Sequence, residues 1–215
     1  MRVLVIGANG RTGGLCIKRL AESDHQPVAM IRRPEQQIAF TEAGIPTVRG
    51  DLEHPIDEAV QGCDAVIFAA GSGGNTGKDK TVLIDHLGGI RAAVAAATNG
   101  VKRFLMLSSM NSTPTAQTPI KHYHRAKAAA DDFLMNMDQV LDEPLDWTIV
   151  APGRLNDDES TGFVEIRSEI TGSGSTSRAH TADVLVACLD LPNTVGKRFA
   201  VIDGAQPMNE ALADI

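Results

Sequence analysis

Aromatic residues are scarce in this chain of 215 residues, where they make up only 4% and include one tyrosine and one tryptophan. A core built from such a sequence must be aliphatic, and hydrophobic residues, at 43%, are plentiful enough to form a sizeable one. A core of Val, Ile, Leu and Ala suits a parallel sheet that is covered on both faces.

Cysteines are also few. Cys16, Cys63 and Cys188 are far apart and odd in number, without the spacing of a disulfide framework or a metal site. We therefore expect reduced thiols, no metal ion and a cytoplasmic location.

Long runs of one kind of residue are missing too. No apolar stretch is long enough to span a bilayer, and no charged leader precedes an apolar segment, so we expect no membrane association. The net charge is −7, and no run of Lys and Arg is long enough to suggest a nucleic-acid or acidic-membrane patch. We expect a small-molecule substrate and a monomer or small homo-oligomer.

What the chain does have is a regular alternation of strand and helix patterns. Apolar, β-branched runs predict strands at residues 3–6, 28–31, 47–48, 65–69, 103–107, 147–150 and 198–202. Helical patterns lie between them at residues 14–22, 34–43, 56–61, 80–98, 119–140 and 181–191, with Thr118 as the expected cap of the fifth. This alternation indicates βαβ units and a single doubly wound α/β domain, whose mostly parallel sheet has helices on both faces.

A glycine turn follows the first predicted strand. The strand at residues 3–6 ends in Gly7, and glycines recur at Gly10 and Gly13 before a helical pattern begins. Glycine lets a backbone approach a diphosphate closely, and the first-turn N–H groups of a helix favour negative charge. The spacing is G-x-x-G-x-x-G rather than G-x-G-x-x-G, and glycines also occur in plain strand–helix turns. The position between a strand and a helix favours dinucleotide binding.

Two arginines follow the second predicted strand. Arg32 lies 19 residues beyond Gly13, where dinucleotide folds place a carboxylate on the ribose of NAD. A guanidinium instead accommodates the 2′-phosphate of NADP, because its planar fork donates two parallel hydrogen bonds. Arg32 and Arg33 therefore predict NADP(H), with NAD(H) as the alternative coenzyme. The other interpretation is two solvated arginines that lead into a helix at Pro34.

A glycine-rich stretch, Gly71-Ser-Gly-Gly-Asn-Thr-Gly-Lys78, follows the fourth predicted strand. It fails the phosphate-loop pattern of ATPases, because Ser72 replaces the first glycine and Asp79 follows the lysine. Ligands of open α/β sheets bind beyond the carboxyl ends of strands, where this loop is expected. It either flanks a coenzyme or is a surface loop.

A tyrosine and a lysine form the candidate acid–base pair. Tyr123 and Lys127 are four residues apart in a predicted helix and therefore share one face. We expect the ammonium to lower the pKa of the phenol towards neutrality, so that Tyr123 exchanges a proton with a substrate oxygen. The strand at residues 103–107 is followed by Ser108 and Ser109, and a serine at this carboxyl end can hydrogen-bond the same oxygen. The Y-x-x-x-K pattern also occurs by chance on amphipathic helices, with the tyrosine half-buried and the lysine solvated. Together with the glycine turn and the serine after the strand, it favours a catalytic pair.

In these motifs the chain resembles the short-chain dehydrogenase/reductase superfamily, in particular its small atypical branch of NAD(P)-binding, NmrA-like and NADH-flavin-reductase-like proteins. The resemblance is carried by Gly7-Ala-Asn-Gly-Arg-Thr-Gly13, Gly50-Asp51-Leu52, Val101-Lys-Arg-Phe-Leu-Met-Leu-Ser-Ser109, Tyr123-His-Arg-Ala-Lys127 and Leu145-Asp-Trp-Thr-Ile-Val-Ala-Pro-Gly-Arg154. It implies a Rossmann-like fold with a small substrate-side segment at about residues 152–180. This segment is shorter than the C-terminal lobe of sugar-nucleotide epimerases.

The resemblance also implies residue roles. Tyr123, Lys127 and Ser109 would be catalytic, and Lys127 would also hold the nicotinamide ribose. The other implied coenzyme contacts are Gly7, Asn9, Gly10, Arg11, Thr12, Gly13, Arg32, Arg33, Asp51, Leu52, Ala69, Ala70, Gly71, Ser108, Pro152 and Gly153. On chemistry alone Asp51 is equally well a turn-capping carboxylate.

Two functions are compatible with these residues. The first is an NADP(H)-dependent oxidoreductase that transfers hydride to a small carbonyl, flavin or quinone-like acceptor. The second is a non-catalytic NADP(H)-binding redox sensor of the NmrA-like type, against which the presence of both Tyr123 and Lys127 argues. We expect Asp131 and Asp132 to be solvated charges and His180 to have a structural role at the start of a helix.

Overall fold

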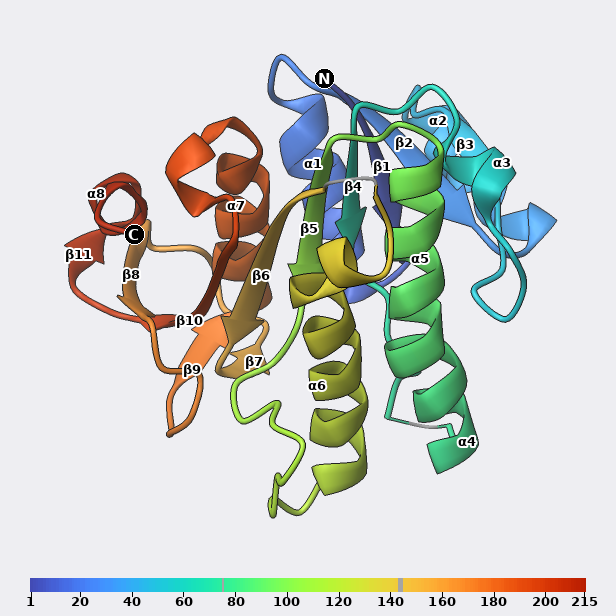
Figure 1. Ribbon diagram of the computed structural model, residues 1–215. Helices are drawn as coiled ribbons and strands as arrows, with labels where there is room; N and C mark the ends of the chain where they lie inside the picture. The colour runs from blue at the N-terminus through green and yellow to red at the C-terminus, as the bar shows by residue number, and fades with distance from the viewer. Residues whose placement is uncertain (75, 143–144) are drawn as a thin grey trace.

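The computed structural model describes residues 1–74, 76–142 and 145–215 and is built on a nine-stranded sheet (Figure 1). The strand order is β11-β8-β10-β6-β5-β4-β1-β2-β3. All strands from β10 to β3 along this row are parallel, whereas β8 pairs antiparallel with β10 and β11. A second, two-stranded sheet pairs β7 with β9. The expected doubly wound, mostly parallel α/β sheet is confirmed.

The strands have these bounds: β1 (Arg2–Ile6), β2 (Gln26–Ile31), β3 (Thr47–Arg49), β4 (Ala65–Phe68), β5 (Arg103–Leu107), β6 (Asp146–Pro152), β7 (Arg154–Asn156), β8 (Phe163–Arg167), β9 (Ser175–Ser177), β10 (Lys197–Asp203) and β11 (Gln206–Pro207). The helices are α1 (Arg11–Ala21), α2 (Gln37–Glu42), α3 (Asp57–Val60), α4 (Lys78–Lys80), α5 (Leu87–Thr98), α6 (Lys121–Met135), α7 (Arg178–Ala187) and α8 (Met208–Ala213). A π-helical segment, Thr81–His86, joins α4 to α5.

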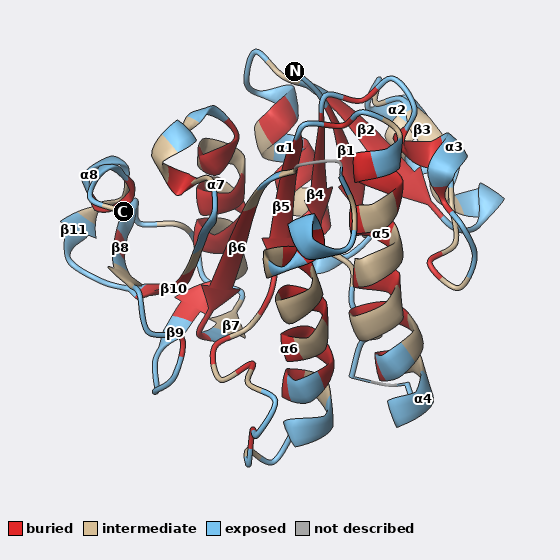
Figure 2. Cartoon of the chain, viewed as in Figure 1, coloured by how far each residue is buried: buried red, intermediate tan, exposed pale blue. Residues whose placement is uncertain are grey.

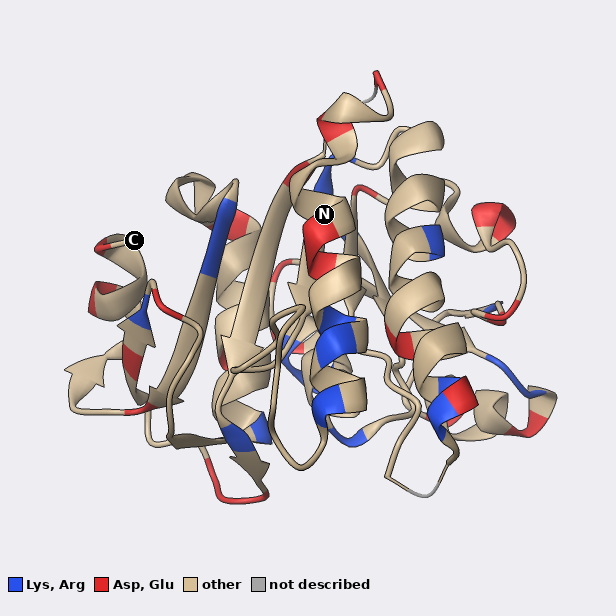
Figure 3. Cartoon of the chain, turned by 60° about the horizontal axis from the view of Figure 1, so that its bottom comes forward, with Lys and Arg blue, Asp and Glu red and all other residues tan. Residues whose placement is uncertain are grey.

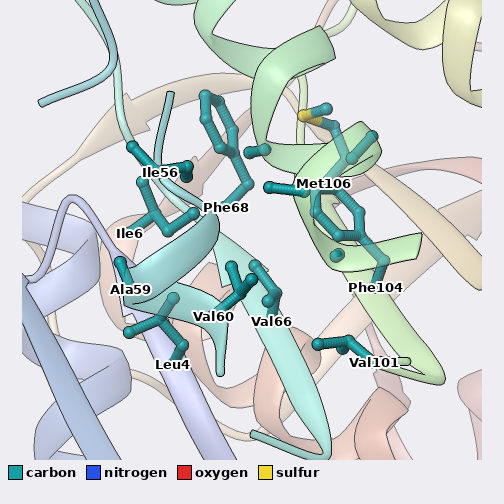
Figure 4. Close-up of a cluster of buried hydrophobic side chains, with 14 of the residues drawn as sticks. Leu4, Ile6, Ile56, Ala59, Val60, Val66, Phe68, Val101, Phe104 and Met106 are labelled. Atoms are coloured by element: carbon teal, nitrogen blue, oxygen red, sulfur yellow. The ribbon is translucent and has the colours of Figure 1, made fainter. Parts of the chain in front are cut away.

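Helices cover both faces of the sheet because successive strand residues point to opposite sides. On β1, Leu4 and Ile6 face the layer of α3, α5 and α6, while Val3 and Val5 face α1 and α7. Figure 4 shows the first of these two layers, where Phe68, Phe104 and Met106 belong to the same buried cluster as Leu4 and Ile6. The buried residues accordingly line the strands and the inner faces of the helices (Figure 2).

The direction in which the chain winds reverses between β1 and β4. From β1 the chain moves outward through β2 and β3, and then returns to β4 on the other side of β1. In open α/β sheets this reversal opens a crevice at the carboxyl ends of the strands, which is the lower edge of the sheet in Figure 1. The loops after β1, β4, β5 and β6 meet at this edge.

Two features at the ends of elements differ from the sequence expectation. The main helix after β5 begins at Lys121 with Ile120 as its cap residue, so the prediction that Thr118 caps it is wrong. The hydroxyl of Thr118 lies 2.7 Å from Nδ1 of His124 instead. The strands β7, β8, β9 and β11 were not predicted, because they have only two to five residues and carry little periodicity.

Across the described residues, none of the helices combines the length and the apolar character that crossing a membrane requires.

Candidate active site

The glycine turn after β1 is built by close backbone contacts. Gly7 has φ +88°, and a Cβ on it would lie 2.7 Å from Cα of Ala70 in the loop after β4. The N–H of Gly10 donates to the Gly7 carbonyl at 2.8 Å. A Cβ on Gly13 would overlap the same carbonyl oxygen. The turn therefore needs glycine at both ends, and it brings the first turn of α1 against the end of β4.

The N-terminus of α1 is open to a ligand. Gly10 is the cap residue and has no side chain to accept the first-turn N–H groups, and no acidic residue lies in the first turn. Uncapped first-turn N–H groups, together with the helix dipole, bind anions. The start of α1 is thus suited to a diphosphate.

A cavity of about 420 Å³ lies beside this turn, at the point where the winding reverses. Its walls include nine of the residues that the sequence assigned to the coenzyme: Gly7, Asn9, Gly10, Arg32, Asp51, Leu52, Ala69, Ala70 and Gly71. Seven further residues complete the lining: Met30, Gln36, Gly50, Ser72, Thr76, Lys80 and Ile84. Ser72 and Thr76 show that the glycine-rich loop flanks the cavity. Asn75 of that loop lies outside the described residues.

Eight predicted coenzyme contacts do not line this cavity. The exposed side chain of Arg11 pairs with Asp157 at 3.2 Å, and that of Arg33 pairs with Glu35 at 3.2 Å. The others are Thr12, Gly13, Ser108, Lys127, Pro152 and Gly153. Gly13 packs against the carbonyl of Gly7 in the turn. Four of the others lie in α6 or at the ends of β5 and β6, on the far side of β4 from Arg32: Ser108, Lys127, Pro152 and Gly153.

Arg32 is the cavity's exposed cation at the end of β2. Its backbone N–H and that of Arg33 both donate to the Gln36 side chain at 2.9 Å, which fixes the turn. Unlike Arg33, Arg32 makes no ion pair with any carboxylate in the described part of the chain. Its guanidinium is therefore available to an anionic group in the cavity.

Lys127 is almost fully buried, with 2% of its side chain exposed. Its ammonium donates to the carbonyls of Leu107 at 3.0 Å and Ala70 at 3.3 Å. Nζ also lies 5.4 Å from the ring centre of Phe68 and 6.0 Å from that of Tyr123. Because Ala70 lines the cavity, Lys127 connects the candidate acid–base pair directly to the cavity wall.

The charges around Tyr123 act in opposite directions. Burial raises the pKa of Tyr123, Lys127 lowers it, and the carboxylates of Asp85 and Asp131 raise it again. The net result is a pKa above its ordinary value, so the expectation that Lys127 brings it towards neutrality is wrong. Burial by itself would lower the pKa of Lys127, but Tyr123, Asp85 and Asp131 together raise it. At neutral pH this site holds a phenol beside an ammonium.

Asp131 lies one turn beyond Lys127 and has no exposed surface, so the expectation that it is solvated is wrong. Its Oδ2 accepts the Ser108 hydroxyl at 2.6 Å and lies 3.0 Å from Nη2 of Arg198. Burial raises the pKa of Asp131 to about 6, although Arg198, Ser108 and Lys127 lower it. Tyr123, Lys127 and Asp131 thus form one face of α6 that points at the end of β5.

The distribution of charge on α6 is not explained by helix stability. Lys121, Arg125 and Lys127 occupy its N-terminal half, and Asp131 and Asp132 its C-terminal half (Figure 3). A helix dipole favours the opposite arrangement. Of these charges, Lys127 and Asp131 are buried and lie at the carboxyl edge of the sheet, whereas Lys121 and Arg125 are exposed.

The two serines after β5 have different environments. Ser108 is buried and its hydroxyl is used by Asp131. Ser109 is partly exposed, and its hydroxyl donates only to the neighbouring carbonyl of Met110 at 3.2 Å. Of the two, Ser109 has the hydroxyl that a substrate can reach.

Replacing Asp131 by asparagine is expected to flatten the dependence of stability on pH. The native pKa of about 6 lies above the ordinary 3.8, so the carboxyl stabilises the fold below about pH 4 and this stability is lost as the pH rises through 6. The wild type should lose about 2 kcal/mol relative to Asp131→Asn between about pH 4 and pH 7. Urea unfolding of both proteins at these two pH values measures the difference. Asp132→Asn, at a partly exposed neighbour, should behave as wild type, and parallel curves for Asp131→Asn would contradict the assignment.

The sequence did not single out Asp85, Asp131 or Arg198 as part of this site. A signal was available for Asp131, which lies four residues beyond Lys127 and eight beyond Tyr123, on the same helical face. Asp85 is a lone acid in the apolar run Val82-Leu-Ile-Asp85. Arg198 lies in β10 and reaches the site only through tertiary packing.

Comparison with known proteins agrees with this geometry. A family model described as NAD(P)H-binding matches residues 7–192, from the glycine turn to beyond α7. The chain belongs to this NAD(P)H-binding family. The resemblance to the atypical branch of the short-chain dehydrogenase/reductase superfamily is confirmed, and with it a nicotinamide coenzyme.

Several relatives cover the whole chain. An uncharacterised Bacillus subtilis (strain 168) protein named sugar epimerase YhfK is 38% identical over 218 residues, with 99% of both chains covered. A solved structure from Bacillus halodurans, described as a candidate NAD-dependent epimerase/dehydratase, has a TM-score of 0.92 and 39% identity, with 100% of both chains covered. The oxidoreductase ylbE from Lactococcus lactis has a TM-score of 0.86 and 28% identity, over 100% of this chain and 96% of that chain. These proteins share the entire fold.

Proposed function

We propose that the protein is an NADP(H)-dependent oxidoreductase acting on a small carbonyl, flavin or quinone-like acceptor. The observation that carries the proposal is the link between the cavity and the acid–base pair: Lys127 donates to the carbonyl of Ala70, and Ala70 lines the cavity. The naming of the Lactococcus lactis relative as an oxidoreductase supports the same chemistry.

The residues of the cavity fit a dinucleotide. The glycine turn and the uncapped start of α1 would bind the diphosphate. Asp51 and Leu52 would flank the adenine, and Arg32 would hold a 2′-phosphate. Lys127, Pro152 and Gly153 would lie along the nicotinamide half, which, when bound, supplies the hydride.

The acid–base pair favours reduction. Because the pKa of Tyr123 is raised, the phenol keeps its proton at neutral pH and can donate it to an oxygen that gains charge as hydride arrives. The Lys127 ammonium stays charged and stabilises the phenolate that is left behind. Ser109 would orient the same oxygen through its partly exposed hydroxyl.

Arg32→Ala is expected to separate the two coenzymes. Loss of the guanidinium removes charge-assisted hydrogen bonds to the 2′-phosphate, so NADPH should bind at least about tenfold more weakly while NADH binding is unchanged. Fluorescence titration with each coenzyme measures this. Arg33→Ala is the matched control, because Arg33 pairs with Glu35 outside the cavity, and it should alter NADPH binding less than about twofold. An equal loss for both coenzymes would contradict NADP preference.

Two observations favour the second candidate, a redox sensor that binds NADP(H) without turnover. The Lys127 ammonium already has two backbone carbonyls as acceptors, and the pKa of Tyr123 is raised rather than lowered. A sensor needs the cavity but no reactive acid.

An acceptor panel decides between the two functions. NADPH consumption is followed at 340 nm with aldehydes, quinones and free flavins. The proposal expects turnover with at least one of these three classes. Absence of turnover with all of them, together with unequal binding of NADP⁺ and NADPH, would support the sensor instead.

A further inference from the structure

Asp85 is a buried carboxylate that none of the assigned roles uses. It lies in the π-helical segment Thr81–His86 and has 0% exposure. This segment packs against α6, so Asp85 faces the helix that carries Tyr123 and Lys127. A buried carboxylate is costly unless it is paired or hydrogen-bonded, so its presence here calls for a physical reason.

The two carboxylate oxygens of Asp85 have different partners. Oδ2 accepts the backbone N–H of Ser72 at 3.0 Å, at the start of the glycine-rich loop. Oδ1 lies 3.6 Å from Nζ of Lys127 and accepts no hydrogen bond from any residue that the structure describes. One oxygen therefore fixes the loop, and the other faces the ammonium.

Lys127 and Asp85 both hydrogen-bond the backbone at the start of the glycine-rich loop. Lys127 donates to the carbonyl of Ala70, two residues before the N–H that Asp85 accepts. A Cβ on Gly71, between them, would lie 3.1 Å from Oδ1 of Asp85, so the backbone passes directly over the carboxylate. Ala70, Gly71 and Ser72 all line the cavity. This segment of the cavity wall is thus held by one cation and one anion.

We propose that Asp85 is a positioning residue that fixes the segment Ala70–Ser72 of the cavity wall against Lys127 and sets the charge acting on Tyr123. Its two oxygens perform separable tasks, because Oδ2 needs only to accept a hydrogen bond, whereas Oδ1 acts through negative charge. The inference rests on the proposed roles of Tyr123 and Lys127, but its test requires no substrate.

The ionisation of Tyr123 reports on this charge. The charged groups that act on its phenol are Lys127 and Asp131 from α6 and Asp85 from the π-helical segment, while the ring of His124 lies 5.7 Å from its ring. Lys127 favours the phenolate, and Asp85 and Asp131 oppose it. Removal of the Asp85 charge should therefore lower the pKa of Tyr123.

The experiment uses the fact that Tyr123 is the only tyrosine in the chain. The tyrosinate absorbance near 295 nm then measures the ionisation of this one side chain. In Asp85→Asn, whose amide oxygen can still accept from Ser72, the ratio of phenolate to phenol at a fixed alkaline pH should rise at least about threefold. NADPH binding should stay within about twofold of wild type, because the loop contact is kept.

Two further variants complete the test. Ser72→Pro removes the N–H but keeps the carboxylate, so NADPH should bind at least about fivefold more weakly while the tyrosine titration stays as in wild type. Asp79→Asn removes an exposed carboxylate from α4 and should change neither measurement. Because Ser72→Pro leaves the buried charges in place, it remains informative even if Asp85→Asn fails to fold.

An unchanged tyrosine titration in folded Asp85→Asn would overturn the charge role, and unchanged NADPH binding in Ser72→Pro would overturn the loop role. If the wild type itself does not bind NADPH, the proposed function fails, while the tyrosine titration still decides the charge role of Asp85.

Discussion

Tyr123→Phe is expected to lower the rate of carbonyl reduction by at least about a hundredfold, because a positioned general acid typically contributes a factor of 10² to 10⁴. The substitution removes only the hydroxyl, and the ring keeps its contacts with His124 and the Lys127 ammonium. NADPH binding should therefore remain within about twofold of wild type. Initial rates of NADPH oxidation with the best carbonyl acceptor of the panel, together with a coenzyme titration, measure both quantities.

The control for this variant is His122→Gln, which changes an exposed neighbour on the same turn of α6. It should keep the wild-type rate. Full activity of Tyr123→Phe on a carbonyl acceptor would show that the phenol is not the acid. A parallel loss of coenzyme binding would show that the substitution acts through the fold of the site.

Gly13→Ala is expected to abolish coenzyme binding. The new Cβ would overlap the carbonyl oxygen of Gly7, and the turn could not close without moving away from Ala70. Displacing the first-turn N–H groups of α1 from the diphosphate should weaken NADPH binding at least about a hundredfold. The overlap should also lower the free energy of unfolding by about 3 kcal/mol. Calorimetric titration and urea unfolding measure the two effects.

Gly14→Ala is the matched control, one residue further along α1. Its Cβ would lie 3.4 Å from the carbonyl oxygen of Ala8, which is an ordinary contact. Alanine also favours a helix interior over glycine by about 0.5 to 1 kcal/mol. The control should therefore bind NADPH and be at least as stable as wild type. If Gly13→Ala behaves in the same way, the close approach of Gly13 and Gly7 does not define the turn.

The sequence predicted the parts of the fold that depend on local pattern. The strands β1, β2, β4, β5, β6 and β10 contain apolar runs, and the glycines of the turn lie between a strand pattern and a helix pattern. The shared face of Tyr123 and Lys127 follows directly from helical periodicity. These features could be found because each depends on residues that are close together in the chain.

The charges of the site could not be predicted in the same way. Asp85, Asp131 and Arg198 come from three separate segments. The packing of α6 on the π-helical segment and the ion pair from Arg198 of β10 to Asp131 bring them together. The raised pKa of Tyr123 is a consequence of that packing, because burial and two carboxylates outweigh one ammonium. The sequence of the helix indicates that Tyr123 and Lys127 share a face. It indicates neither that the two side chains are buried nor that carboxylates lie beside them.

Calorimetric titration of the wild-type protein with NADPH and with NADH tests the central claim most directly, namely that the cavity at the carboxyl ends of β1, β2 and β4 holds a phosphorylated nicotinamide coenzyme. The account predicts one site per chain, at least about tenfold tighter binding of NADPH than of NADH, and loss of the site in Gly13→Ala but not in Gly14→Ala. Binding of neither coenzyme, or binding that folded Gly13→Ala leaves unchanged, would contradict it.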